Sequence, residues 1–469
     1  YTVIDFYRMR KSSDRVVLLD FERCATQVFD GGLPVLTNTG INLGILPEDT
    51  QYMANTAGDI VAFVANGDLW SYNRSADKCT KVFSFREKGG YELDERYNYG
   101  QHDIHIVRVS ESGDITFVVY GYMNRGIHEG ETGVAVYNFQ AEPQTAQEVL
   151  FVPATVSYPM LRQSVDVLSY VSTEGMLYLY LNDSLYQLNL ADGNYQVLQE
   201  GIAAECFVVS ENQANVAWMA ANSASEATKI TVMSLETQET LSVTAGEGQK
   251  VRALGFIHND FVYGIANDGD IITDISGNQT FAMNTIRILG SDGALRKEYH
   301  QDGVYVTGVT ISDGLLEMNR VVRQGDGYAE TAQDHIMNGE QQAEEAVTSR
   351  MATIGDRRQQ QMVLEFSDTG HSEKLLNTEA RFSVRSASSA LNITYGLGAE
   401  AVYFVYAKGE LQSMMSSPAE AILAADDQVG VVLNQNQAYV WERGNRPTSA
   451  QIHPAALPGG FRDRPLYAA

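Results

Sequence analysis

The chain repeats one phrase, in which a turn rich in Ser, Gly and Asp leads into an apolar strand and a second strand follows after a polar break. Clear copies occupy residues 58–73, 113–139, 174–190 and 210–235. One four-stranded blade of a β-propeller takes roughly 40 to 60 residues, and the copies recur at about that interval. The repeat therefore predicts an all-β fold, a single β-propeller of about seven or eight four-stranded blades.

The composition agrees with this reading. Apolar residues make up 44% of the 469 residues, and 25 Tyr recur with Val, Ile and Phe in short runs. Such runs favour strands over helices, because β-branched and aromatic side chains pack well on a pleated surface. Four successive apolar runs at 104–110, 115–122, 133–139 and 148–154 form the clearest predicted blade.

We divide the chain into four predicted segments. Because residues 325–361 are rich in Glu, Gln and Ala, they are expected to form a short helical insertion, either a solvated connector or a partner-binding arm. Strands of 2–7 or 15–21 are expected to pair beside 438–444 and so close the propeller. The predicted segments are blades in 1–324, the insertion in 325–361, further blades in 362–445, and a tail rich in Pro and Gly in 446–469.

The charge restricts the partners. The formal net charge is -26, and no Lys/Arg-rich cluster offsets it locally, so nucleic acid is excluded as an expected partner. No run of 18 or more apolar residues predicts a membrane-spanning helix. The sequence begins at Tyr1 without Met, which is consistent with a removed signal peptide or an upstream anchor. We expect an extracytoplasmic protein, either secreted or at the cell surface.

One hairpin carries a candidate ligand site. Residues 122–133 place Arg125, His128, Glu129 and Glu131 among three glycines, between two predicted strands. Glycines let a backbone approach a ligand, and the mixed charges could orient a polar group or a sugar. The alternative is a long β-turn with an exposed ion pair of little energetic value.

A second turn resembles a calcium loop in its oxygen content. Asp268, Asp270 and Asp274 lie close together in the sequence, with Asn267 beside them. The segment lacks the Gly and terminal Glu of an EF-hand, and an ordinary Asp-Gly hairpin turn is the alternative. Calcium is the one cofactor that the sequence leaves open.

Motifs for catalysis are missing from the sequence. It contains no G-x-S-x-G elbow and no HExxH pair, and we assign no catalytic residue. A non-catalytic module for binding proteins or ligands is therefore the favoured function. The alternative is an enzyme or binding protein for glycans, which would need carboxylates from several blades to converge.

Two segments resemble a known repeat. SESGDITFVVYG followed by GVAVYNF, and SENQANVAWMA followed by KITVMSLETQETL, are similar to TolB-like and WD40-like propeller repeats, although the WD dipeptide of true WD40 blades is missing. The resemblance covers about two thirds of the chain. It implies a propeller that binds proteins or ligands at its faces, as in the ectodomains of bacterial cell-surface proteins, and no particular activity. We expect the partner to be a protein or a carbohydrate bound at a propeller face.

Overall fold

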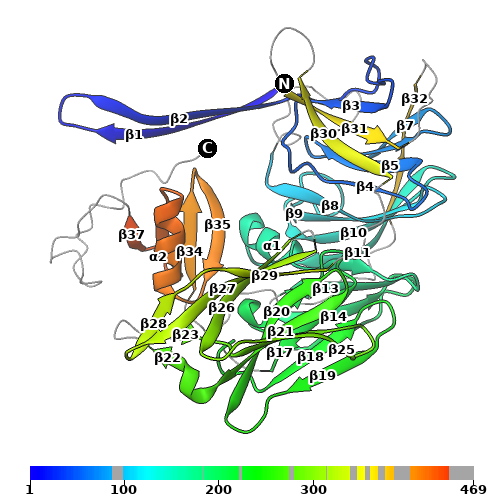
Figure 1. The fold of residues 1–469 in the computed structure, drawn as a ribbon. Coiled ribbons are helices and arrows are strands. Elements are labelled where there is room, and N and C mark those ends of the chain that lie inside the picture. The colour runs from blue at the N-terminus through cyan, green and yellow to red at the C-terminus, as the bar shows by residue number, and fades with distance from the viewer. Residues whose placement is uncertain are drawn as a thin grey trace. The chain divides into compact units, whose positions relative to one another are not determined.

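The computed structural model describes ten stretches of the chain. These are residues 1–86, 99–181, 183–220, 224–273, 279–312, 314–338, 346–353, 360–367, 375–384 and 402–442. Residues 27–396 form one compact unit, and residues 1–26 with 397–469 form a second. Figure 1 labels the elements of both. The predicted tail of 446–469 lies outside the described residues.

Consecutive antiparallel strands build the sheets of the larger unit. The first three sheets comprise β4 (Tyr52–Ala54), β5 (Ile60–Ala65), β6 (Asp68–Asn73) and β7 (Lys78–Phe83); β8 (His102–Val109), β9 (Ile115–Tyr122), β10 (Thr132–Gln140) and β11 (Thr145–Pro153); and β12 (Ser169–Val171), β13 (Met176–Leu181), β14 (Ser184–Asn189) and β15 (Tyr195–Gln199). The helix α1 (Tyr158–Val165) lies between the second and the third.

Three more sheets follow along the chain. They comprise β16 (Phe207–Val209), β17 (Asn215–Met219), β18 (Lys229–Ser234) and β19 (Thr240–Thr244); β20 (Gln249–Ile257), β21 (Asp260–Asn267), β24 (Thr285–Leu289) and β25 (Leu295–His300); and β26 (Val304–Ser312), β27 (Leu315–Gln324), β28 (Gly327–Glu330) and β29 (Asp334–Met337). Short elements accompany them, namely η2 (Ala204–Cys206), η3 (Asp268–Asp270) and the hairpin of β22 (Ile271–Thr273) and β23 (Gln279–Phe281).

The repeated turn of the sequence joins the first strand of a sheet to its second. At Ser110 and Ser172, the backbone N–H donates to the carbonyl four residues later, and the hydroxyl accepts from the N–H of that same residue. Asn55 and Ser210 close the same turn over five residues, with the Asn55 amide oxygen and the Ser210 hydroxyl as the side-chain acceptors. This side-chain bond gives the backbone a closed turn in place of a continuing strand. Glycine suits the fourth position of this turn because Gly113 has a φ of +85°, which glycine adopts without strain.

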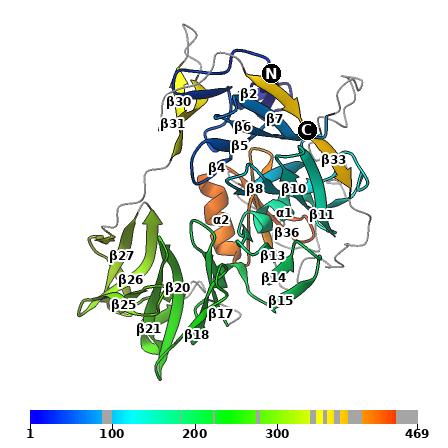
Figure 2. The same cartoon turned by 90° about the vertical axis from the view of Figure 1, so that its right-hand side faces the viewer.

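Apolar clusters join each sheet to its neighbour. One cluster joins β4–β7 to β8–β11, a second joins β8–β11 to β12–β15, and a third extends from β12–β15 to β20–β25. The first strands also touch in sequence, β4 with β8, β8 with β12, and β20 with β26. Figure 2 shows the sheets following one another along the chain. Four-stranded antiparallel sheets packed in this way are the blades of a β-propeller, so the all-β propeller prediction is confirmed, while the number of blades stays a prediction.

The predicted closure between the ends of the chain is wrong. One early strand, β3 (Gly40–Gly44), instead lies beside the late strand β31 (Gln360–Phe366), which is itself paired with β30 (Val347–Thr353). Strand 15–21 pairs within its own hairpin instead, since a two-stranded hairpin is the shortest route for consecutive strands. Two late strands extend earlier sheets in parallel, β32 (Leu376–Glu379) beside β7 and β33 (Arg381–Val384) beside β11.

The predicted helical insertion of 325–361 is also wrong in the described residues. They form strands, of which β28 and β29 both pair with β27. In β28 and β29, contacts with β26 and β27 determine the structure, while residues 339–345, which carry most of the helix propensity, lie outside the described residues. The Tyr328 ring meets Tyr305 at 5.4 Å, and the Arg320 side chain donates to Ala332 O and to the Asp334 carboxylate.

The smaller unit contains a hairpin and a four-stranded antiparallel sheet. The hairpin pairs β1 (Thr2–Lys11) with β2 (Val16–Thr26). The four-stranded sheet has the order β35 (Glu410–Met415), β34 (Tyr403–Ala407), β36 (Val431–Asn434) and β37 (Tyr439–Glu442). The helix α2 (Pro418–Asp427) packs Ala421 and Ala425 against Val405 and Val432 of this sheet.

Candidate functional site

One end of the β8–β11 sheet gathers a cluster of polar side chains from two strands and a helix. The strands β8 and β10 begin at this end, and β9 and β11 finish there. The helix α1 follows β11, with Ser157 at its N-cap, and buries Leu161 and Val165 in the cluster shared with β12–β15. Tyr158, Arg162 and Asp166 are spaced four residues apart, so the helical periodicity places them on one face.

That face meets two residues of the sheet. Asp103 of β8 lies opposite Tyr120 of β9 in the register. The Tyr158 hydroxyl donates to Asp103 Oδ2 at 2.5 Å, and the Tyr120 hydroxyl donates to Asp166 Oδ1 at 2.7 Å. Arg162 Nε lies between the two carboxylates, 3.6 Å from Asp103 Oδ2 and 3.7 Å from Asp166 Oδ2. We call these five residues the α1 cluster.

The α1 cluster is buried on one side and open on the other. The side chains of Asp103, Arg162 and Asp166 are 40%, 49% and 47% exposed. Burial, reinforced by the nearby Asp charges, raises the pKa of both Tyr hydroxyls far above the ordinary value, so they remain hydrogen-bond donors. Burial alone would lower the pKa of Arg162, but the charge of Asp103 and its neighbours holds it above the ordinary value. The cluster therefore presents a fixed cation between two acceptors.

A histidine with its own partner lies on the same strand. Burial lowers the pKa of His105, against the attraction of Asp166, so the ring is neutral at neutral pH. Gln51 fixes this ring, since Gln51 Nε2 lies 3.0 Å from His105 Nδ1 while Gln51 Oε1 accepts from Ile106 N. His105 therefore adds no positive charge to the α1 cluster at neutral pH.

The predicted ligand hairpin is at the same end of this sheet, and the structure ties part of it to the sheet. The His128 ring stacks on Phe151 with centroids 3.6 Å apart, and His128 Nε2 lies 3.0 Å from Glu148 Oε1. Glu131 Oε2 lies 3.8 Å from His128 Nδ1. Arg125 is half-buried and Glu129 is exposed in the same turn. The structure gives His128 a packing role, and binding by the four residues stays a prediction.

The predicted calcium turn is only partly described. Asp274 lies outside the described residues. Asp270 Oδ1 is 3.4 Å from Arg323 Nη1, and Asp270 Oδ2 accepts from Asn267 at 2.9 Å. Asp268 is in the same short helix, η3. The described contacts of Asp270 thus connect this turn to β27, and calcium binding stays a prediction. The described part of the chain contains no group of three or more His, Cys, Asp or Glu arranged to hold a metal ion.

The sequence prediction missed the α1 cluster. The spacing of Tyr158, Arg162 and Asp166 is a detectable signal once a helix is expected there. Asp103 and Tyr120 carry no such signal, because their approach depends on the pairing of β8 with β9 and on where α1 packs. In the described residues, no helix is long and apolar enough to cross a membrane.

No family model matches the chain, and no curated protein matches it. Solved structures similar to it are β-propeller proteins. They include the tricorn protease (11% identity, TM-score 0.31, 66% of this chain and 30% of that one), Porphyromonas gingivalis dipeptidyl peptidase 4 (10%, 0.29, 66% and 57%) and a chain of the mitotic checkpoint complex (9%, 0.30, 73% and 98%). The chain thus spans less than two thirds of the first two. At these TM-scores we base no functional argument on them.

Proposed function

We propose that this protein is a non-catalytic interaction module that acts outside the cytoplasm and binds a polypeptide partner at the α1 cluster. The likeness of its turns to TolB-like and WD40-like repeats, and to the ectodomains of bacterial surface propellers, supports this class of function. A location at the cell surface or in the medium belongs to the same proposal.

The arrangement of Asp103, Arg162 and Asp166 carries the proposal. Two half-exposed carboxylates present acceptors on either side of one guanidinium, and Tyr hydroxyls hold both carboxylates in place. Fixed donors and acceptors lose little entropy on binding, so they suit the alternating N–H and C=O groups and charged side chains of a peptide.

The same arrangement favours binding over glycan cleavage. A glycosidase needs one carboxyl group that carries a proton to give to the leaving oxygen. Each carboxylate of the α1 cluster accepts a hydrogen bond from a Tyr hydroxyl and lies near the Arg162 guanidinium. Donors and a positive charge around a carboxylate favour its role as a hydrogen-bond acceptor. We therefore assign Asp103 and Asp166 a role in binding.

Selection from a random peptide library displayed on phage, with the full chain as bait, tests this function. Peptides that bind the wild type are expected to lose affinity about tenfold with Asp166→Asn, because a hydrogen bond to a charged group is lost. Asn keeps an oxygen that can accept from Tyr120. The matched control is Asp292→Asn, which removes an exposed carboxylate paired with Arg296.

Two results would refute the proposal. One is that no peptide is enriched over a blank surface. The other is that the selected peptides bind Asp103→Asn and Asp166→Asn as tightly as the wild type. Release of reducing ends from a neutral oligosaccharide, lost in those same variants, would establish the glycan-cleaving enzyme instead.

A further inference from the structure

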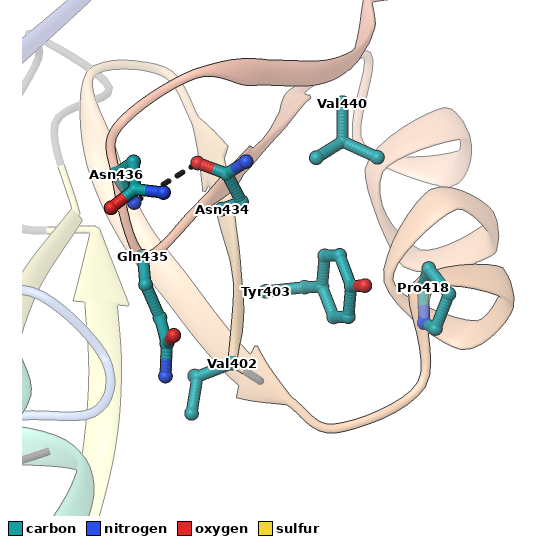
Figure 3. A pocket seen from close by; sticks show the side chains of 7 residues that line it. All are labelled: Val402, Tyr403, Pro418, Asn434, Gln435, Asn436 and Val440. Atoms are coloured by element: carbon teal, nitrogen blue, oxygen red, sulfur yellow. Dashed lines mark hydrogen bonds between the residues drawn. The ribbon is translucent and has the colours of Figure 1, made fainter. Parts of the chain in front are cut away.

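The smaller unit contains a pocket that the proposed function does not use. It lies on the four-stranded sheet of this unit, where the first turn of α2 meets the start of β34 and the end of β36, and its volume is about 310 Å³. Figure 3 shows the Tyr403 side chain in the middle of the pocket, with Pro418 and Val440 on one side and Gln435 on the other.

The lining of the pocket combines one aromatic ring with amides. Tyr403 is half-buried, and Val440 is 39% exposed. On the opposite side, Asn434 Oδ1 accepts from the backbone N–H groups of Asn436 and Ala438 at 3.0 Å each. These bonds fix the turn after β36, and they leave the Asn434 amide nitrogen as a donor. Asn436 is exposed at the rim of the pocket.

The charges around the pocket select a neutral ligand. None of the described lining residues is charged. A cation would find no carboxylate among them to replace its hydration. An anion would meet Glu420 in the first turn of α2, at the helix end that would otherwise attract it, and the chain as a whole carries a net charge of -26.

A neutral ligand for this pocket needs an apolar face and a polar edge. Sugar rings have both, since their C–H groups stack on an aromatic ring and their hydroxyls both donate and accept hydrogen bonds. The Tyr403 ring supplies the stacking surface, and the amides of Asn434 and Asn436 supply partners for hydroxyls at the other side. Amides bind hydroxyls in either direction and without charge.

We propose that this pocket binds a neutral sugar unit of a carbohydrate, with Tyr403 as the stacking residue and Asn434 and Asn436 as its hydrogen-bonding partners. This site lies in the smaller unit and is independent of the α1 cluster. It gives the protein a carbohydrate contact that needs no catalytic group.

The test is binding of the full chain to an immobilised panel of neutral oligosaccharides built from glucose, galactose, mannose and N-acetylglucosamine. The best-bound member of the panel is then titrated against variants by calorimetry. Tyr403→Ala is expected to weaken its binding about tenfold through loss of the stacking surface, whereas Tyr403→Phe keeps the ring and most of the affinity. The matched control is Tyr439→Ala, which removes an exposed ring of the same sheet outside the pocket.

Tyr403 also packs beside the small core of this unit, so Tyr403→Ala is checked for folding by near-ultraviolet circular dichroism. Asn436→Ala, at an exposed position, tests the pocket without touching that core and is expected to weaken binding about threefold to tenfold, through loss of one hydrogen bond. Peptide binding at the α1 cluster is expected to remain unchanged in both variants, which separates this proposal from the proposed function.

The proposal is overturned if no member of the panel binds, or if the best-bound sugar binds Tyr403→Ala and Asn436→Ala as tightly as the wild type. It is also overturned if a proline-containing peptide, and no sugar, competes for the pocket. That result would assign the Tyr403 ring to peptide recognition.

Discussion

The sheets of residues 52–337 and the β1–β2 hairpin use similar residues but stabilise their strands differently. Leu179 of β13 is 0% exposed and lies in an apolar cluster shared by two sheets. Leu18 of β2 is 55% exposed. Figure 1 draws the hairpin as a long two-stranded ribbon. Strand-forming residues are therefore enough to form a strand, while burial against a second layer provides most of its stability.

Local pairs across the two strands replace that second layer in the hairpin. The rings of Tyr7 and Phe21 are 5.0 Å apart, and Arg23 donates two hydrogen bonds of 2.7 Å to the Asp5 carboxylate. The guanidinium lowers the pKa of Asp5, chiefly through this hydrogen bonding, which outweighs the opposite effect of burial. Exposed pairs of this kind contribute little each, so we expect the two regions to respond differently to the same substitution.

The largest effect is expected in the sheets. Leu179→Ala removes a fully buried side chain between β12–β15 and β8–β11 and leaves a cavity. The free energy of unfolding is expected to fall by about 2 to 5 kcal/mol, as for other Leu→Ala changes in cores. Denaturant titration followed by circular dichroism measures it. A loss below about 1 kcal/mol would show that this sheet is not held by burial.

A smaller loss in the free energy of unfolding is expected at Arg320, where a polar network fixes strands that the sequence did not predict. The Arg320 side chain is 14% exposed and donates to Ala332 O and to Asp334, which fixes the break between β28 and β29. Arg320→Met keeps the apolar stem but leaves those acceptors without their donor, at an expected cost of about 1 to 3 kcal/mol. Denaturant titration compares it with Arg296→Met, which removes a half-exposed ion pair and is expected to change little. If both substitutions lower the free energy of unfolding equally, the hydrogen bonds of Arg320 do not stabilise the fold as proposed.

The connections between neighbouring sheets are expected to depend on pH. Thr56, by its hydroxyl and its backbone N–H, and then Ala57 and Asn55, donate to Glu111, and these bonds lower its pKa below the ordinary 4.5. A carboxyl group with a lowered folded pKa stabilises the fold above its unfolded pKa, and this stabilisation is lost as the pH falls through the folded value. The loss of stability between pH 5 and acidic pH is therefore expected to be smaller in Glu111→Gln than in the wild type.

Thermal unfolding of both proteins at a series of pH values measures this difference. The control is Glu174→Gln, which removes a carboxylate from the corresponding turn of the β12–β15 sheet. Identical pH profiles for the wild type and Glu111→Gln would refute the contribution of Glu111.

The sequence predicted features that depend on local chemistry. The Ser-x-x-Gly-Asp turn is an example, because Ser110 and Gly113 make its bonds within five residues. It also predicted the all-β propeller from the repetition of such turns. It failed for the described part of 325–361, where β28 pairs with β27 and the Tyr328 ring packs on Tyr305 of β26.

In the candidate sites too, the sequence reveals the local spacing of residues but not the contacts between distant strands. Three members of the α1 cluster come from one helix and have a recognisable spacing, but Asp103 and Tyr120 reach it only through the pairing of β8 with β9. In the predicted ligand hairpin, the sequence revealed His128 but not Phe151, the ring on which it stacks. Contacts between distant strands depend on register and packing, which single-residue patterns do not encode.

The smallest loss in the free energy of unfolding is expected in the β1–β2 hairpin. Leu18→Ala is the same chemical change as Leu179→Ala, but it removes a side chain that is already 55% exposed. The free energy of unfolding is expected to change by less than about 0.5 kcal/mol, because water already surrounds most of that side chain. The same denaturant titration measures both variants. A loss above about 1 kcal/mol would mean that a second layer covers this part of β2 in solution, and the hairpin would then belong with the buried sheets.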